Sequence, residues 1–493
     1  MKPSIFRRSV AKVINLNQAS EELENIFKHI EDNLDYTLDK TEELVKQPSI
    51  SPESVGIEDC AKIVADYFTD FVCDTSEVVE TDGNPIVYGE YDCGAEKTLL
   101  GYFMYDTQPY DEELWDHPPM GANLVSMDMP NGEVEALVNR GAFNTKGPMV
   151  TFLAALRSIK ETKGELPVNL KLIAEGEEEL GSPSLPGFVE SYNDRLSDSD
   201  ACFFPFFLQD QKGNVDMYLG NKGLVYFELE CSGSSWGRGP EEYDIHGSNK
   251  AWMDSPAWRM IGALSSLCEG NDILVDGFYE NVDPLTEEEK ELVKDLAESF
   301  DPEPIKEINK VSKFSVDEEN TKELIEAYVG NTTLNIDGIW GGYTGEGSKT
   351  VLPYKVTAKL DARLVPNQTQ DEILEKIRSH LDEHGYEDIE VNVLNEGYGW
   401  SRTNLEEDVV QAGVETIRDF DLEPRIWPRL AGTAPFYLFS EELDLPFTFG
   451  LMGHGGKEHS PNEYIIFQGN EKIAGFNRIQ QSFVRFLYRY ANR

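Results

Sequence analysis

The sequence predicts an α/β protein whose larger domain is built on a mostly parallel sheet, with a smaller α+β domain inserted into it. Two observations lead to this fold class. Up to about Gly220, helical patterns alternate with buried apolar runs, as in a parallel sheet whose strands are joined by helices. After Gly220, the strands alternate between apolar and polar residues, which is typical of a sheet with one solvated face. At 493 residues with 40% hydrophobic residues, the chain is long enough for two or three packed domains.

The N-terminal half supplies most of the larger domain. Apolar residues at spacings of three and four predict one amphipathic helix within Glu21–Val45, and the segment Gln47–Pro52 ends it. Further along, helix and strand alternate at a helix near Glu58–Phe71, a strand at Lys97–Tyr105, a helix through Met149–Ile159 that Pro148 opens, and a strand at Val168–Ala174. This order predicts parallel strands whose carboxyl ends lie at one edge of the sheet.

The middle of the chain predicts the inserted domain. Its expected elements are strands at Leu224–Glu230, Tyr354–Leu364 and Ile389–Leu394 and helices at Thr286–Phe300 and Gln370–Leu381. Thr286 and Glu289 have the spacing of a capping box. We expect residues 1–221 and 399–493 to form the larger domain and residues 222–398 the insertion. The C-terminal segment from Val409 onward returns to helix and buried strand.

The charge of the chain excludes several classes of function. Lys and Arg number 43 against 91 Asp and Glu, a formal net charge of −48. Such a surface disfavours binding to nucleic acid or to anionic membranes. A salt-rich cytoplasm is one hypothesis for this acidity, although Lys outnumbers Arg. No apolar run is long enough to span a membrane, and the six cysteines are scattered without a CxxC pair, so we expect a cytoplasmic protein with reduced thiols.

One acidic motif stands where an α/β sheet binds its ligands. Glu175-Gly-Glu-Glu-Glu-Leu-Gly-Ser182 follows the strand that ends at Ala174. Adjacent carboxylates there suit a metal ligand beside a general base, although an acidic loop is the commoner explanation in a chain this acidic. Three other segments share the position or carry histidines, namely 104–109, 140–147 and the Gly-rich segment 453–464.

Taken together, the motifs resemble the M20 family of metallopeptidases, the group of carnosinase, succinyl-diaminopimelate desuccinylase and acetylornithine deacetylase. Members carry HxDxxP, GxxDxKG, EGxEExGS, DLHSG, NxxGxxGG, RLVP, GSIP and HSPNE in this order. The chain shows MYDTQP, GAFNTKG, EGEEELGS, DIHGS, NIDGIWGG, RLVP, AGTAP and HSPNEY. The length and the insertion are most similar to the dipeptidase branch. The resemblance implies that the insertion is a lid that mediates a homodimer.

The resemblance also implies roles for individual residues. Glu178 matches the general base, and Glu179 and His459 match the ligands of one zinc. Asp106 matches the carboxylate that orients a ligating histidine, and His246 matches the lid histidine that acts in the partner subunit's site. The residues that match the groups holding the substrate's carboxylate are Arg363, Asn335, Gly432 and Thr433.

Three departures weaken the metal site. Met104 replaces the first ligating histidine, Asn144 replaces the bridging aspartate, and Phe206 replaces the remaining aspartate, with Asp210 the nearest acid. A thioether and a phenyl ring are poor replacements for oxygen and nitrogen ligands. We therefore expect no two-metal centre. A single zinc or manganese is possible on Glu179, His459 and, weakly, Asn144.

The losses also have a structural interpretation. Met104 and Phe206 are expected to fill the abandoned metal position, and the retained acids and His459 would form an ionic hydrogen-bonded cluster. His117 and His454 are the nearby candidates to rescue a metal, and each is expected to be a surface or packing residue instead.

Three hypotheses about function remain open at this point. The chain is an amide or peptide hydrolase for a dipeptide or N-acyl amino acid with a free carboxylate, working with at most one metal. Alternatively, it binds a peptide-like ligand without hydrolysis. The third hypothesis is metal-free acyl-transfer or lyase chemistry on the same scaffold. Metal content separates the first hypothesis from the others, and a substrate screen separates the second from the third.

Overall fold

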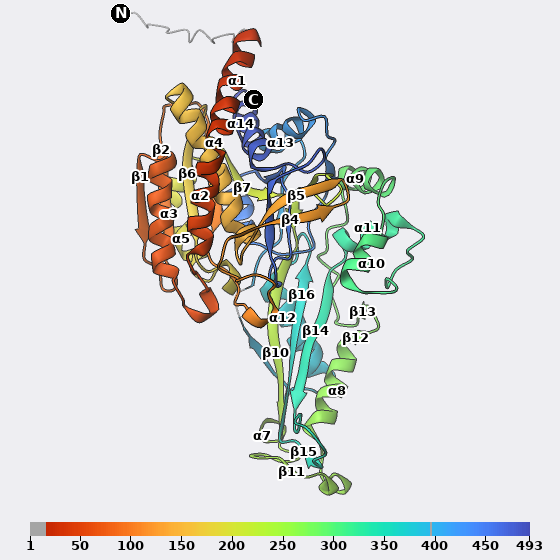
Figure 1. The fold of residues 1–493 in the computed structure, drawn as a ribbon. Helices are drawn as coiled ribbons and strands as arrows, with labels where there is room; N and C mark the ends of the chain where they lie inside the picture. The colour runs from red at the N-terminus through yellow and green to blue at the C-terminus, as the bar shows by residue number, and fades with distance from the viewer. Residues whose placement is uncertain (1–15, 395–396) are drawn as a thin grey trace, which may run out of the picture.

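The computed structural model describes residues 16–394 and 397–493 and contains a six-stranded sheet at the centre of the larger domain (Figure 1). The strand order is β1-β2-β6-β3-β7-β20, in which the pairs β6–β3, β3–β7 and β7–β20 are parallel. Their bounds are β1 (Thr75–Val79), β2 (Ile86–Tyr91), β3 (Thr98–Met104), β6 (Asn169–Glu175), β7 (Ala201–Phe207) and β20 (Phe447–Leu451). The predicted mostly parallel α/β sheet is confirmed.

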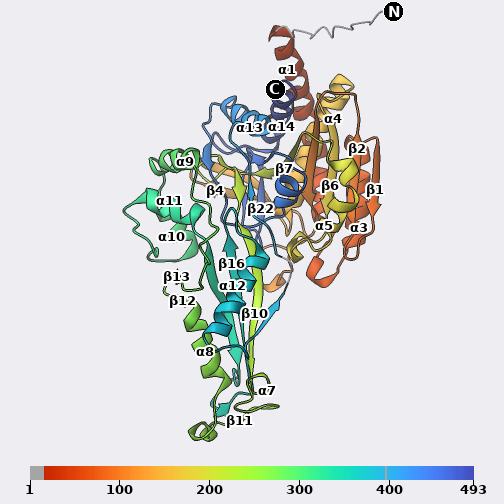
Figure 2. The same ribbon diagram turned by 180° about the vertical axis from the view of Figure 1, so that it is seen from behind.

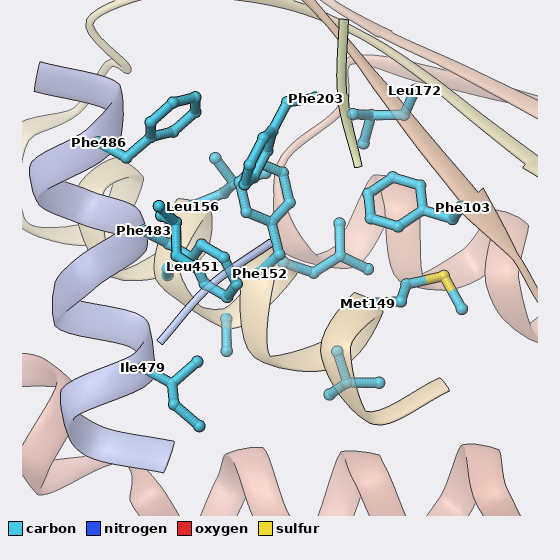
Figure 3. Packing of buried hydrophobic residues seen from close by; sticks show 14 of the residues in the cluster. Phe103, Met149, Phe152, Leu156, Leu172, Phe203, Leu451, Ile479, Phe483 and Phe486 are labelled. Carbon is cyan, nitrogen blue, oxygen red and sulfur yellow. The ribbon is translucent and has the colours of Figure 1, made fainter. Parts of the chain in front are cut away.

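Helices cover both faces of this sheet because successive residues of its strands point to opposite sides. Figure 3 shows one face, where Phe152 of α4 has its ring centroid 6.0 Å from Phe103, 5.5 Å from Phe203 and 5.3 Å from Phe483 of α14. The helices on this side are α1 (Leu16–Asp32), α2 (Leu34–Lys46), α3 (Ile57–Phe71), α4 (Gly147–Lys163), α13 (Asp408–Arg418) and α14 (Phe476–Ala491). The other side is covered by α5 (Leu185–Ser191), α6 (Asn193–Leu196) and the turn η6 (Leu438–Glu442).

The single helix expected within Glu21–Val45 is wrong in one respect, since the structure divides it into α1 and α2 at Asn33. The Asn33 side chain donates to the His29 carbonyl at 2.8 Å, and its backbone leaves the helical region at φ −120° and ψ 17°. Asparagine competes in this way for the carbonyl that a continuing helix would use.

A second sheet lies beside the first and brings two loops of the site together. Its order is β21-β22-β5-β4, all antiparallel, with β4 (Asn123–Met129), β5 (Gly132–Val138), β21 (Gly455–Gly456) and β22 (Tyr464–Gln468). Tyr464 pairs with Val138, so the segment after β5 runs beside the segment before β22. These two segments contain Asn144 and His459.

The inserted segment, called the lid below, forms a long four-stranded antiparallel sheet that extends away from the larger domain (Figures 1 and 2). Its order is β14-β16-β10-β17, with β10 (Gly223–Ser232), β14 (Thr333–Gly341), β16 (Lys355–Leu364) and β17 (Glu390–Val393). α8 (Pro256–Leu267) and α12 (Gln370–Glu383) bury apolar residues of β10 and β16 on one face, which leaves the opposite face polar. The tip carries α7 (Gly233–Trp236), β11 (Ile245–His246) and β15 (Val351–Leu352).

A small helical group flanks the lid near the larger domain. It comprises α9 (Glu287–Ala297), α10 (Glu303–Asn309) and α11 (Thr321–Gly330). The predicted capping box at Thr286 is confirmed, since its hydroxyl accepts from the Glu289 amide at 3.1 Å and Glu289 accepts from the Thr286 amide at 2.8 Å. Apolar residues of α9 and α11 pack on Trp427 of β19 (Arg425–Trp427), which pairs with β8 (Asp216–Tyr218).

Short strands complete the fold, namely β9 (Gly220–Asn221), β12 (Cys268–Glu269), β13 (Asp272–Ile273) and β18 (Ser401–Arg402). β9 pairs with β18, so the chain enters and leaves the lid side by side. All six cysteines are free thiols. Among the described residues, no helix is both long and apolar enough to cross a membrane.

Candidate functional site

The carboxyl ends of β3 and β6 meet at one edge of the main sheet, and the predicted acidic residues lie there. Met104 pairs with Glu175 in the parallel register, and the Tyr105 amide donates to the Glu175 carbonyl at 2.9 Å. After β6 the chain turns through the short helix η4 (Glu178–Leu180). The loops after these two strands therefore face each other, as the order of the elements predicts.

Asp106 holds the η4 turn in place. Its side chain is fully buried and accepts hydrogen bonds from the Ser51 hydroxyl at 2.6 Å, the Glu178 amide at 3.2 Å and the Glu179 amide at 3.1 Å. Burial raises the pKa of Asp106 to about 7, and the neighbouring Glu179 carboxylate adds to the rise. In this structure its partners are a hydroxyl and two backbone N–H groups.

Glu179 lies at the centre of a cluster of nitrogen atoms. Gln108 Nε2 lies 2.9 Å from Oε2, Asn144 Nδ2 lies 2.8 Å from Oε1, and His459 Nε2 lies 3.0 Å from Oε2. Asn144 Nδ2 is also 3.1 Å from His459 Nε2. The hydrogen bond to Glu179 raises the pKa of His459, because the carboxylate favours the protonated imidazole. The structure thus brings together all three residues predicted as metal ligands, and adds Gln108.

A second buried carboxylate shapes the loop that carries Asn144. Glu463 is 1% exposed and accepts from the amides of Gly141, Phe143 and Asn144, each at 2.9 Å, and from Arg140 Nη1 at 2.8 Å. Burial raises the pKa of Glu463, although these donors oppose the rise. Three backbone donors and one guanidinium leave the loop little freedom, so the Asn144 side chain is aimed at Glu179.

Glu178, the predicted base, has a carboxyl group with no hydrogen-bond partner among residues 16–394 and 397–493. Burial raises its pKa well above the usual range, and the carboxylates of Glu179, Asp106 and Glu175 add to the rise. Glu175 behaves similarly, since burial raises its pKa to about 8 while the Tyr102 hydroxyl donates to it at 2.5 Å. Glu175 and Glu178 therefore hold a proton more tightly than a solvated carboxyl group does.

Two positions that the motif resemblance aligns with metal ligands hold apolar side chains. Met104 is 4% exposed and belongs to the cluster on one face of the sheet, against which Phe206 also packs. The Phe206 ring centroid lies 4.7 Å from Phe143 and 5.6 Å from Phe204. Neither side chain offers a ligand atom of the kind that zinc prefers, and a two-metal centre therefore does not fit these residues. Throughout the described part of the chain, no three His, Cys, Asp or Glu side chains lie close enough together to hold a metal.

The other candidate ligands have different partners. Asp210 pairs with Arg425 Nη2 at 3.0 Å and accepts from Asn214 Nδ2 at 2.7 Å. His454 is buried, with Nδ1 2.7 Å from the Gln209 carbonyl oxygen and Nε2 3.0 Å from the Tyr464 hydroxyl. His117 is exposed. The predicted packing and surface roles of the two histidines are confirmed.

The residues predicted to hold a carboxylate form a second polar group, on β14, β16 and one loop of the larger domain. Arg363 donates through Nε to Asp361 at 3.1 Å and through Nη1 to the Thr433 hydroxyl at 2.6 Å. Asn335 Nδ2 donates to the other Asp361 oxygen at 3.0 Å. Gly432 precedes Thr433, where an added Cβ would lie 3.3 Å from the Leu430 side chain. Since these contacts use two of the five N–H groups of Arg363, the others remain available to a ligand.

Tyr398 connects the two polar groups. Leu224 pairs with Arg363 across β10 and β16, and its backbone exchanges hydrogen bonds with Tyr398 at 2.9 Å in each direction. The Tyr398 hydroxyl donates to the Glu178 carbonyl at 3.3 Å and lies 3.3 Å from the Ser182 hydroxyl. Leu224 and Tyr398 therefore link Arg363 to the η4 turn by one series of contacts among the described residues.

His246 lies apart from both groups. It is exposed on β11, at the tip of the lid and at the opposite end of the molecule from β6 in both views (Figures 1 and 2). Its ring nitrogens contact the Ser248 hydroxyl at 2.8 Å and the Thr350 hydroxyl at 3.2 Å. Within one chain, His246 does not reach Glu178.

Sequence reasoning missed four residues that build the site, namely Gln108, Asp361, Glu463 and Tyr398. Gln108 and Glu463 stand inside the motifs MYDTQP and HSPNEY, and Asp361 lies two residues before RLVP, so their position in or beside a motif was the available signal. For Tyr398 the sequence gives no such signal, because its contacts depend on how the lid joins the larger domain.

Comparisons with known proteins agree with this arrangement. Residues 105–474 match the sequence model of peptidase family M20/M25/M40. Human Beta-Ala-His dipeptidase is 31% identical over 414 residues, which cover 80% of this chain and 76% of the relative. The Cys-Gly metallodipeptidase DUG1 of Candida albicans is 28% identical over 400 residues and 77% of each chain.

Solved structures give the same result. An M20 family metallo-carboxypeptidase from Sulfolobus solfataricus superimposes with a TM-score of 0.83 at 32% identity, covering 93% of this chain and 99% of the other. Human carnosine dipeptidase 1 superimposes with a TM-score of 0.75 at 25% identity, covering 96% and 100%. The family match spans more than half of the sequence and the fold agrees over nearly the whole chain, so this protein belongs to peptidase family M20/M25/M40.

Proposed function

We propose that this protein is an M20-type amide or peptide hydrolase that acts on a dipeptide or an N-acyl amino acid with a free carboxylate, using at most one metal ion. The observation that carries the proposal is the series of contacts that links Arg363 to the Glu178 turn through Leu224 and Tyr398. We propose that a ligand bound between them presents its carboxylate to Arg363 and its amide to Glu178.

The Arg363 end supplies recognition. Asp361 and Thr433 fix the guanidinium, so its remaining N–H groups can pair with a carboxylate without losing side-chain freedom on binding. The relatives named above are a Beta-Ala-His dipeptidase, a Cys-Gly metallodipeptidase and a metallo-carboxypeptidase, whose names describe peptide substrates. A small peptide with a free carboxyl end is the corresponding ligand class here.

The Glu178 end supplies the proton chemistry. Its carboxyl group has no partner among the described residues and lies next to the turn that Asp106 fixes, so it is free to accept or donate a proton at a bound amide. Its raised pKa means that a nearby positive charge, from the ligand or from an ion, favours the ionised form that acts as a base.

A single zinc or manganese ion is the most that the donors support. Glu179, His459 and the Asn144 amide lie within about 3 Å of one another, which is a possible set of three ligands. Such an ion would act as a Lewis acid and would activate water.

A second candidate function is binding of the same ligand without hydrolysis, or metal-free acyl-transfer or lyase chemistry. The observation that favours it is the set of nitrogen donors already bonded to Glu179. Met104 and Phe206 stand at two positions that the resemblance aligns with metal ligands, and their apolar packing points the same way.

For the assembly, we propose a homodimer in which His246 reaches the site of the partner subunit. The strand β14 is an edge of the lid sheet, and it exposes Ile336, Ile339 and Trp340. Mixing a His246→Ala protein with a Glu178→Ala protein should restore activity in the heterodimer, which keeps one intact site. No recovery from an active wild type would contradict this arrangement.

We also propose the division into residues 1–221, 222–398 and 399–493, because β9 and β18 lie side by side where the chain enters and leaves the lid. A cytoplasmic location remains our expectation.

The test of function uses a panel of dipeptides and N-acetyl amino acids, each offered with a free and with an amidated carboxyl end. Binding is followed by calorimetry and turnover by mass spectrometry of the products. We expect binding of free acids only, with products that disappear in Glu178→Gln. Binding without products would support a ligand-binding protein, products other than those of hydrolysis would support transfer or lyase chemistry, and equal binding of the amidated ligands would contradict all of these.

A further inference from the structure

The nitrogen atoms around Glu179 come from three separate parts of the chain. Gln108 stands in the loop after β3, Asn144 in the turn before α4, and His459 in the loop between β21 and β22. The Glu179 side chain is only 3% exposed, so little water reaches its oxygens. A buried carboxylate needs such partners or a cation, because leaving it unpaired in the interior is costly.

Hydrogen-bond donors of the protein face both oxygens of the Glu179 carboxylate. The side chains of Asn144 and Gln108 are neutral amides whose N–H groups contact these oxygens directly. Asn144 Nδ2 lies 2.8 Å from Oε1 and Gln108 Nε2 lies 2.9 Å from Oε2, while His459 Nε2 lies 3.1 Å from Oε1 and 3.0 Å from Oε2.

Further hydrogen bonds hold the backbone of Asn144 and the side chain of Gln108. The backbone amide of Asn144 donates to Glu463 at 2.9 Å, and Gln108 Nε2 lies 3.4 Å from the Glu179 carbonyl as well as 2.9 Å from the side chain. A carboxylate at position 144 would instead place a second negative charge about 3 Å from Glu179. The amide at this position therefore matches a carboxylate held by hydrogen bonds and does not match one shared between cations.

We infer that Gln108 and Asn144 are positioning residues that hold the Glu179 carboxylate where a metallopeptidase uses a cation, so that this site keeps its shape without a metal ion. The inference rests on the proposed function only in taking this edge of the sheet as the functional site. It goes beyond that proposal because it assigns the positioning of the Glu179 carboxylate to two neutral side chains in place of a cation.

The first measurement is made on the wild-type protein. Elemental analysis after purification, and melting temperatures in EDTA and in excess zinc or manganese, report whether an ion belongs to the native state. We expect no stoichiometric ion and a melting temperature that changes by less than about 1 °C between these conditions. An ion bound in stoichiometric amount and lost in His459→Ala would overturn the inference.

The second measurement restores the missing charge with Asn144→Asp. In EDTA this variant should melt about 3 °C or more below the wild type, because two carboxylates then face each other. Zinc should raise its melting temperature again and bind in stoichiometric amount, an effect that a merely structural role of Asn144 would not produce. If the variant folds only when expressed with zinc, that dependence is itself the expected gain.

Asn84→Asp is the matched control. Asn84 is also half-buried, and its side chain donates to the Gly176 carbonyl at 2.7 Å in the same turn region. Its replacement should lower the melting temperature without any response to zinc. A response of Asn84→Asp equal to that of Asn144→Asp, or no response of Asn144→Asp, would overturn the inference. A failure of the proposed function can be distinguished from this, because the protein would then bind no ligand of the panel, with or without a metal ion.

Discussion

At the lid end of the site, Arg363 keeps a charged partner in Asp361 and has free donors, whereas at the sheet end Glu179 is surrounded by Gln108, Asn144 and His459. At the lid end, the remaining N–H groups of Arg363 can pair with an anionic ligand. At the sheet end, the hydrogen-bonding capacity of the carboxylate is already used by the protein itself. The two ends therefore differ in how far their charged groups are already bonded within the protein.

The largest expected effect lies at the lid end. Arg363→Gln should weaken binding of a free-acid ligand about 1,000-fold, because a charge-assisted pair is lost while the rest of the site stays. Calorimetry with the ligand found in the panel measures this. Arg378→Gln is the control, since Arg378 is also on the lid, is 32% exposed against 34% for Arg363, and pairs with Asp382 on α12. Equal losses in the two variants would mean that the lid end is not a recognition site.

The next effect concerns the loop that supports the sheet end. Glu463→Gln should lower the free energy of unfolding by about 3 kcal/mol, because Arg140 then stays buried without a counter-charge. Urea unfolding measures the change. Glu458→Gln, in the exposed part of the same loop, should change it by less than about 0.5 kcal/mol. If both variants behave alike, Glu463 does not fix the Asn144 loop.

The pH dependence of stability should also come from the sheet end. Burial raises the pKa of Asp106 to about 7 and of Glu175 to about 8. The folded state therefore binds more protons than the unfolded state between about pH 4 and 8, so both groups favour folding in acid and this contribution is lost as the pH rises. The melting temperature of Glu175→Gln should fall by several degrees less than that of the wild type between pH 5 and 9.

Parallel pH curves for the two proteins would show that Glu175 ionises at its ordinary pKa. Glu190→Gln, on the exposed surface of α5, is the control and should leave the slope unchanged.

The smallest expected effect is the dependence of the melting temperature on salt, which distinguishes buried contacts of the site from charges on the surface. With a net charge of −48, the folded chain repels itself, and raising KCl from about 0.1 to 2 M should raise the melting temperature by a few degrees through screening. The difference between wild type and Gln108→Met should stay constant across this series, because the hydrogen bonds to Glu179 are buried. A fold indifferent to salt would reject the hypothesis of a salt-rich origin, and a salt-dependent difference would place Gln108 in a solvated environment.

The ordered motifs made much of this architecture predictable, including the meeting of Glu179, Asn144 and His459 and the contact of Arg363 with Thr433. The rest depends on contacts between distant segments that no local pattern records. Gln108 binds Glu179 across 71 positions and Asn144 binds Glu463 across 319. The break at Asn33 was missed because the apolar spacing continues through it, while a single side-chain hydrogen bond stops the helix. The place of His246 at the lid tip likewise follows from the length of β10 and β16 rather than from its motif.

Tyr398 gives the molecule a mechanical property. Its backbone is bonded to the start of β10, and its hydroxyl touches the turn that carries Glu178. Both crossings between the lid and the larger domain are within a few residues of these contacts. A rotation of the lid about these crossings would move the phenol relative to the turn, and the Glu178 carbonyl and the Ser182 hydroxyl would then lose one partner. Tyr398 thus joins the lid sheet to the turn that carries the acidic residues.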